Sequence, residues 1–335
     1  MSKKEKHEFD PYIVRSVKGY VEEPAKKIPV VAAPDVLVVG GSQTGVTAAI
    51  AAARNGGNVM LVERFGFLGG QSVYCMVTQW EKRAFVNNLG AVLTKGIPEE
   101  IKNRVVAKGG SDGLWETPPG CEEMRGGEEF LNPEAIKVTL IEMCREEGVE
   151  VLLHTLAVNV LVNRSNDIPK LEGVVFENKT GRFAIQASVI IDATADLDLV
   201  WRAIGEEGCG VQKPQKRMTS SFYTWFAGVD NTTFVEWFIT ESGASGVYPD
   251  PRGRPEKVRK HLREGKEIKI SGDAFRRVLE EATDEGLMAP IEKAMEEAGC
   301  RGVLSLEMKW VGYDRWAPAL LTINDLNMLD AWQLT

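Results

Sequence analysis

One stretch of the sequence constrains the fold more than any other. Asp35–Val39 is a short continuous apolar run, typical of a strand buried in a parallel sheet. It is followed by the glycine-rich turn Gly40–Gly45, the alanine-rich segment Val46–Arg54 and a second apolar run, Asn58–Val62. This order predicts one complete βαβ unit, in which the helix connects two parallel strands.

The glycine-rich turn has the character of a phosphate-binding loop. Gly40 allows a sharp turn off the strand, and Gly45 allows the helix to lie close to the sheet. The free amides at the helix start then favour a pyrophosphate. Glu63 ends the second strand, about 20 residues after Gly40, where a carboxylate accepts from a ribose hydroxyl. We therefore predict a dinucleotide site that includes Gly40, Gly41, Ser42, Thr44, Gly45 and Glu63.

The residues after Glu63 bear on which dinucleotide binds. A nicotinamide dehydrogenase usually continues directly into another helix and strand of an open sheet. This chain instead continues through an extended glycine-rich segment, which could lie along a longer ligand and so favours FAD. Further candidate cofactor residues are Arg64, Gly69, Gly70, Gln71 and Ser72. A dehydrogenase that uses NAD(P) remains the alternative enzyme.

Composition divides the chain into an arm and two domains. Residues 1–33 are charged and then rich in proline and alanine, which predicts an N-terminal arm outside the core. Residues 34–210 are predicted to form the cofactor domain, with a turn-rich, irregular insertion at about 96–131. Residues 211–335 carry aromatic strands and charged helices and are predicted to form a second domain.

Several elements of the first domain can be placed from the sequence. Asn132 and Pro133 predict the start of a helix that runs to Glu147. Glu150–Val162 is strand-like, and residues 171–177 and 182–187 predict a hairpin. Val189–Thr194 predicts another buried strand.

Charge and residue counts exclude several classes of function. The net charge of −8 and a pI near 5.3 argue against nucleic acid and against an anionic membrane surface. No apolar run approaches the roughly 18 residues of a membrane span. The segment Met1–Asp10 lacks the apolar stretch of a signal peptide, so a cytoplasmic location is expected. The five cysteines form no C-x-x-C pair, and no metal site is expected.

These residues resemble a known family. Asp35–Gly70 is similar to the FAD-dependent oxidoreductase family of the glutathione-reductase-like flavoprotein fold. Asn132–Lys137, Gly148–Thr155 and Ile191–Asp198 match it further and in the same order. The resemblance implies non-covalently bound FAD. It also implies that Ala157 and Val158 pass the adenine, and that Ala193 and Thr194 close over the cofactor.

The sequence departs from the family pattern at three single positions and at its C-terminal end. Ser42, Ala195 and Leu197 stand where the pattern usually has glycine. A residue forced to positive φ would cost on the order of 1–2 kcal/mol, although the Ser42 hydroxyl could instead donate to a phosphate. The family is also expected to continue beyond Thr335, and Ile323–Thr335 reads as the start of a helix. We therefore expect a shortened chain whose flavin ring end is incompletely enclosed.

Few side chains suggest catalysis. Cys75 follows the glycine-rich segment and is a weak catalytic candidate, more often a small buried hydrophobe. His154 lies within a predicted apolar strand and is expected to be structural. The aromatic segments 222–226 and 310–316 could form one wall of a substrate site, although aromatic strands more often fill a core. Residues 256–269 are expected to form a solvated helical face.

The sequence as a whole predicts an α/β protein with a Rossmann-like FAD-binding domain and a second, β-rich substrate domain. The predicted function is an FAD-dependent oxidoreductase that moves a hydride or an electron pair between an unidentified small-molecule substrate and an acceptor. A non-catalytic protein that has kept the fold but lost the flavin is a third hypothesis. A homo-oligomer and a redox partner protein both stay open.

Overall fold

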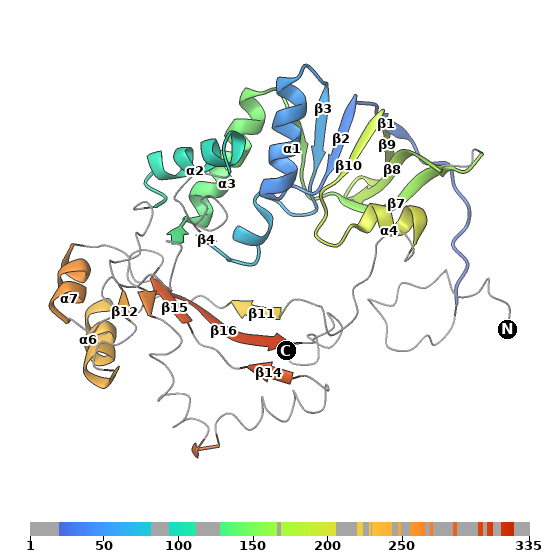
Figure 1. Cartoon of the computed structure of the whole chain (residues 1–335). Helices are drawn as coiled ribbons and strands as arrows, with labels where there is room; N and C mark the ends of the chain where they lie inside the picture. The colour runs from blue at the N-terminus through green and yellow to red at the C-terminus, as the bar shows by residue number, and fades with distance from the viewer. Residues whose placement is uncertain are drawn as a thin grey trace.

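The computed structural model of this chain describes most of residues 20–205 and several shorter segments after them (Figure 1). The described residues are 20–81, 94–111, 128–165, 169–205, 220–223, 228, 230–242, 247–248, 255–264, 269–270, 284–286, 301–303, 307–310 and 316–324.

A four-stranded parallel sheet forms the centre of the first part of the chain. Its order is β10 (Val189–Asp192), β2 (Val36–Val39), β3 (Val59–Val62) and β6 (Glu150–Leu152). The side chains of β2 and β3 are almost all buried, which explains their continuous apolar sequences. The predicted βαβ unit is confirmed, with α1 (Gln43–Arg54) starting at Gln43 rather than at Val46.

Three helices cover one face of this sheet. α1, α2 (Ile97–Ala107) and α3 (Pro133–Glu146) share a buried apolar cluster with β2 and β3. The start of α3 is as predicted, since the Asn132 side chain accepts from the amides of Glu134 and Ala135 at 2.8 and 3.4 Å.

The prediction of an irregular insertion at 96–131 is wrong for residues 97–107, which form α2. Ile101 and Val105 are both fully buried and lie on one face of that helix, because residues four apart are neighbours. The many turn residues on either side obscured the helical spacing of these apolar residues in the sequence. Residues 112–127 lie outside the described residues.

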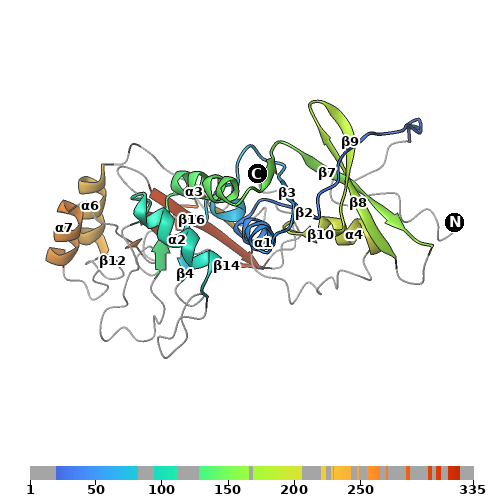
Figure 2. The ribbon, with the colours of Figure 1, turned by 90° about the horizontal axis from the view of Figure 1, so that it is seen from above.

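An antiparallel hairpin and two flanking strands cover the opposite face of the parallel sheet (Figure 2). Their order is β1 (Val30–Ala32), β9 (Gly181–Gln186), β8 (Lys170–Asn178) and β7 (Leu156–Asn163). The predicted hairpin is confirmed as β8 and β9. The last residues of the predicted arm form β1, which pairs with β9 instead of lying free of the fold.

The segment Glu150–Val162 is extended, as predicted, except at a break between two strands. It forms β6 in the parallel sheet and β7 in the second sheet. His154 lies between them with a φ of +52°, in the left-handed region, and is exposed. That conformation turns the chain from one sheet into the other, and an apolar pattern alone does not reveal it.

The rest of the described chain is rich in strands, as predicted, although the domain boundary near 210 stays a prediction. β11 (Ser220–Tyr223), β16 (Trp316–Asn324), β15 (Glu307–Trp310), β13 (Lys269–Ile270) and β12 (Val247–Tyr248) form one sheet, and β14 (Arg301–Val303) also pairs with β16. α6 (Asn231–Ser242) and α7 (Pro255–Arg263) are joined by Arg259 and Glu236 at 2.7 Å. α7 covers part of the expected solvated helix, yet its Val258 is buried.

The first two residues of the predicted C-terminal helix form the end of a strand instead. Ile323 and Asn324 belong to β16, where they pair with Ser220 and Arg301 among others. Residues 325–335 lie outside the described residues, as do Thr224–Phe226 and residues 311–315 of the aromatic segments.

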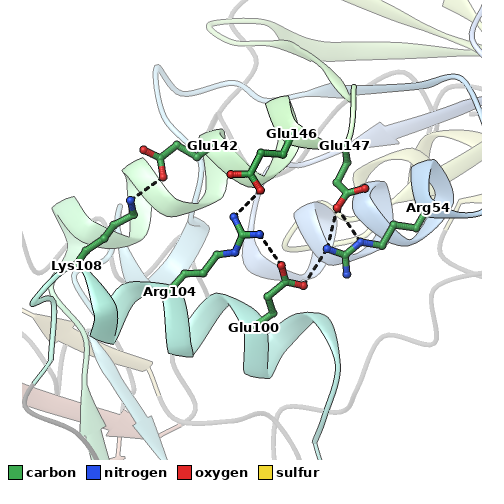
Figure 3. Close-up of polar contacts among 7 residues, drawn as sticks. All are labelled: Arg54, Glu100, Arg104, Lys108, Glu142, Glu146 and Glu147. Carbon is green, nitrogen blue, oxygen red and sulfur yellow. Dashed lines mark hydrogen bonds and ion pairs between the residues drawn. The ribbon is translucent and has the colours of Figure 1, made fainter.

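An ion-pair network ties the three covering helices together (Figure 3). Arg54 of α1 contacts Glu100 of α2 at 2.9 Å and Glu147, at the end of α3, at 2.8 Å. Arg104 of α2 contacts Glu100 at 2.7 Å and Glu146 of α3 at 2.6 Å. Glu100 therefore joins two arginines, of which Arg54 links α1 to α2 and to the end of α3, and Arg104 links α2 to α3.

This arrangement makes the Glu100 charge a contributor to stability. Burial alone would raise the pKa of Glu100, but hydrogen bonds and charges from Arg54 and Arg104 outweigh burial and lower that pKa. A carboxyl whose pKa is lower in the folded state stabilises the fold above its unfolded-state pKa, and the contribution disappears as the pH falls through the folded value.

We expect Glu100→Gln to lower the free energy of unfolding by about 1 kcal/mol at pH 7, since this side chain is 29% exposed and part of a network. The difference from wild type should shrink below about pH 4.3, where unfolded glutamate protonates. Urea unfolding at several pH values measures both effects. Glu142→Gln, which removes the separate pair with Lys108, is the matched control and should cost less. Equal costs for the two variants would contradict a networked role for Glu100.

Candidate functional site

The candidate site lies at the carboxyl edge of the parallel sheet. β2, β3 and β10 end at Val39, Val62 and Asp192, and the chain continues from them into Gly40, Glu63 and Ala193. Because the strands are parallel, these continuations meet at one edge. Open α/β sheets bind ligands at that edge.

The loop between β2 and α1 is too tight for side chains at two positions. Gly40 has a φ of +106°, and a Cβ there would collide with the carbonyl oxygen of Ala193. A Cβ on Gly45 would collide with the carbonyl oxygen of Gly40. Both glycines thus have the conformational role that their spacing predicts, and the Ala193 segment closes against the loop.

Ser42 does not have the positive φ that would strain a residue other than glycine. Ser42 has a φ of −67° and a ψ of 174°, and its hydroxyl accepts from the Gly45 amide at 3.4 Å as the N-cap of α1. The left-handed conformation occurs instead at Leu197, with a φ of +57°, directly before α4 (Asp198–Ile204). Ala195 does not have a positive φ.

The start of α1 carries donors that nothing in the described part of the chain accepts. These are the backbone amides of Gln43 and Thr44 and the buried side-chain nitrogen Nε2 of Gln43. Unpaired amides at a helix start favour an anion. The bare loop and these donors fit the pyrophosphate of a dinucleotide. Sequence reasoning missed Gln43, whose amide gives no pattern by itself.

Glu63 joins two loops of the site. Its side chain is 7% exposed, its Oε2 accepts from the Gly41 amide at 2.6 Å, and its Oε1 accepts from the Phe65 amide at 2.8 Å. Each carboxylate oxygen has two lone pairs, so a ribose hydroxyl can still donate to it. The sequence predicted the ribose contact but not this link between the loops.

The segment after Glu63 folds back against the glycine loop. The Gly69 amide donates to the Gly41 carbonyl at 2.8 Å, and a Cβ on Gly70 would lie 2.6 Å from that of Ser42. The structure therefore brings together two sets of residues that the sequence predicted separately. Ser72 is buried and accepts from the Trp80 indole at 3.2 Å, whereas Gln71 is exposed.

An aromatic stack runs along the same segment. Phe65 stacks on Tyr74 with ring centroids 4.0 Å apart and on Phe67 at 5.7 Å. The Arg64 guanidinium lies 4.6 Å from the Phe65 ring centroid, and Lys137 caps Phe67 at 4.8 Å. These contacts hold the segment from Arg64 to Tyr74 in place at the sheet edge.

Asp192 organises the remaining predicted residues and was missed from the sequence. Its carboxylate accepts from the Thr194 hydroxyl at 2.6 Å and from the amides of Leu199 and Val200 at 2.9 and 3.1 Å. Thr194 is thus occupied by Asp192 at the start of α4. Ala157 and Val158 lie half-buried in β7, away from the glycine loop in sequence.

Cys75 is exposed, so the expectation of a buried hydrophobe is wrong. Partial burial nevertheless raises the pKa of the Cys75 thiol, and the Arg64 charge offsets this only in part. Burial raises the pKa of Cys144 to about 12. Neither group is a thiolate at neutral pH, which is the form that reacts. Cys121, Cys209 and Cys300 lie outside the described residues.

Comparison with known proteins gives one extensive match. The family model described as FAD dependent oxidoreductase matches residues 35–298. No curated protein matches the sequence. Within the described residues, no helix is both long and apolar enough to cross a membrane.

Several solved structures are similar at low identity. THI4 of Thermovibrio ammonificans is 18% identical, with 63% of this chain and 72% of that chain covered and a TM-score of 0.38. A geranylgeranyl bacteriochlorophyll reductase-like protein of Thermoplasma acidophilum is 19% identical, with coverage of 59% and 48% and a TM-score of 0.40. The myxobacterial chondrochloren halogenase CndH is 14% identical, with coverage of 87% and 53% and a TM-score of 0.45. The chain thus spans about half the length of the last two.

The two hydrogen bonds of Glu63 predict a structural role that does not need a cofactor. Glu63→Gln replaces one acceptor oxygen with a donor, which leaves the Gly41 or the Phe65 amide unpaired. We expect the free energy of unfolding of the cofactor-free protein to fall by about 1.5–3 kcal/mol. Urea unfolding measures it, with the exposed Glu177→Gln as control. An unchanged midpoint would show that the carboxylate does not hold the loops.

The left-handed Leu197 predicts a stabilising substitution. Its side chain is 42% exposed, so little burial is lost when it is shortened. Asparagine adopts the left-handed region at a lower cost than leucine does. We expect Leu197→Asn to raise the free energy of unfolding by about 1 kcal/mol, through this backbone effect alone, because Asp192 already accepts from the first amides of α4. Thermal unfolding tests this, and a lower midpoint would contradict it.

Proposed function

This chain belongs to the FAD dependent oxidoreductase family, and from that membership we propose that it moves a hydride or an electron pair between a small-molecule substrate and an acceptor, using non-covalently bound FAD. The observation that supports a working site best is the set of unpaired donors at the start of α1, beside a loop that has no room for a side chain at Gly40 or Gly45.

Different residues of the site would bind different parts of the cofactor. The amides of Gln43 and Thr44 would hold the pyrophosphate, because the helix start favours negative charge there. Glu63 would accept from the ribose of the adenosine half with the lone pairs that Gly41 and Phe65 leave free.

The flavin ring supplies the redox chemistry when FAD is bound, and the protein supplies position and electrostatics. Glu63 and the Gly69–Gly41 hydrogen bond fix the loops on both sides of the helix start before the cofactor arrives. Fixed donors need no reorganisation on binding, which favours affinity. The Arg64 guanidinium, held over Phe65, adds a positive charge beside the same edge.

The test is reconstitution of the full chain with FAD. We expect a yellow complex with the two visible flavin bands, and a titration that saturates at one FAD per chain. Gly45→Ala should weaken FAD binding at least tenfold, because its Cβ would push the helix start away from the loop.

Gly56→Ala is the matched control, since a Cβ at Gly56 meets nothing within 4 Å. Gly56 has a positive φ and Gly45 does not, so this variant is strained in its backbone but leaves the site unchanged, and FAD affinity should stay at the wild-type value. Binding of NAD(P)H in place of FAD would support a nicotinamide dehydrogenase. Binding of neither dinucleotide would support a protein that has lost catalysis.

A further inference from the structure

Helix α4 has an outer apolar face that the described part of the chain leaves largely exposed. Leu197, directly before the helix, is 42% exposed, and Ile204, at its end, is 48% exposed. Trp201 lies half-buried between them, and its amide donates to the Leu197 carbonyl at 2.9 Å. Because residues three and four apart are neighbours on a helix, these three side chains form one row, the α4 stripe.

The opposite face of α4 already packs against the body of the protein. Leu199 is fully buried in the apolar cluster between the two sheets. The helix lies beside β7 (Figure 1), and the Arg164 guanidinium, just after that strand, donates to the Ala203 carbonyl at 2.6 Å. A helix of a globular protein typically has one apolar face, which it turns toward the core. A second apolar face on α4 therefore indicates that another surface packs on the α4 stripe.

Two opposite charges flank the α4 stripe on one side. Asp198 and Arg202 follow Leu197 and Trp201 directly in sequence, so each lies about 100° farther around the helix axis. Both charged side chains are exposed, and neither forms a salt bridge with another described residue. The flank thus carries an acid at the start of the helix and a base one turn later.

This pattern is complementary to itself. In a two-fold contact the same surface of both copies meets, and each residue faces the counterpart of its own partner. When two α4 helices pack antiparallel in this way, their stripes face one another and the same flank of each helix meets. Asp198 of one copy then lies opposite Arg202 of the second copy, and the reverse pair forms on the other side of the axis. Apolar contact and charge complementarity therefore favour the same partner, a second copy of this chain.

We propose that the α4 stripe joins two copies of this chain in a two-fold dimer, with an Asp198–Arg202 ion pair on each side of the axis. A helix of seven residues supplies much less than the roughly 800 Å² per partner of a stable interface. The dimer is therefore weak, and its population rises with protein concentration. The contact does not need a bound cofactor, so it is independent of the proposed function.

Sedimentation equilibrium of the full chain, at concentrations up to the high micromolar range, tests the contact. We expect a monomer–dimer equilibrium for wild type and a monomer throughout for Ile204→Asp, which puts a charge into the α4 stripe. Val138→Asp is the matched control, because Val138 of α3 is 47% exposed but lies outside the stripe. It should dimerise as wild type does. A wild type that stays monomeric, or an Ile204→Asp variant that still dimerises, would overturn the proposal.

Charge reversal tests the antiparallel geometry. Arg202→Glu leaves two acids on the flank and Asp198→Lys leaves two bases, so each variant alone should dimerise at least about tenfold more weakly than wild type. An equimolar mixture of the two should dimerise to within about threefold of wild type, because an acidic flank then meets a basic one. Loss of folding in either variant could not produce this rescue. A mixture that stays as monomeric as its components would show that the two helices do not meet in this way.

Discussion

The candidate site depends on one buried carboxylate. Glu63 accepts from the Gly41 amide after β2 and from the Phe65 amide after β3, so a single side chain fixes two neighbouring loops. The Phe65 segment in turn binds the chain after β6 through its carbonyl. These hydrogen bonds hold the ends of β2, β3 and β6 in place relative to one another, and they need no ligand. A buried carboxylate is costly unless it is hydrogen-bonded, and here the backbone supplies those bonds.

The two faces of the parallel sheet are covered in different ways, and this directs binding to the remaining edge. Helices α1, α2 and α3 pack on one face, and the sheet that contains β8 and β9 packs on the other. The two central strands, β2 and β3, therefore have apolar side chains throughout and offer no polar group on either face. Polar chemistry is concentrated where the strands end, among Gln43, Glu63 and Asp192.

The βαβ unit could be predicted because its signals are local: two apolar runs, a glycine turn between them and a terminal glutamate. The Ser42 conformation could not, since serine suits both an N-cap and a phosphate contact and the sequence does not choose between them. The break at His154 was hidden because the residues on both sides are apolar and the deciding feature is a backbone angle. Asp192 was overlooked as a site organiser because its partners are the amides of a helix that begins six residues later.

The short strand β1 has a consequence for how the protein behaves at high concentration. It lies on the outer edge of β9 and is only Val30–Ala32, with Pro29 before it and Pro34 shortly after. Without it, the longer β9 would present unpaired backbone groups to which another chain could add. β1 covers those groups, and its own length and flanking prolines make it a poor template for a further strand. β1 thus ends the sheet on this side and protects the β9 edge against the addition of another chain.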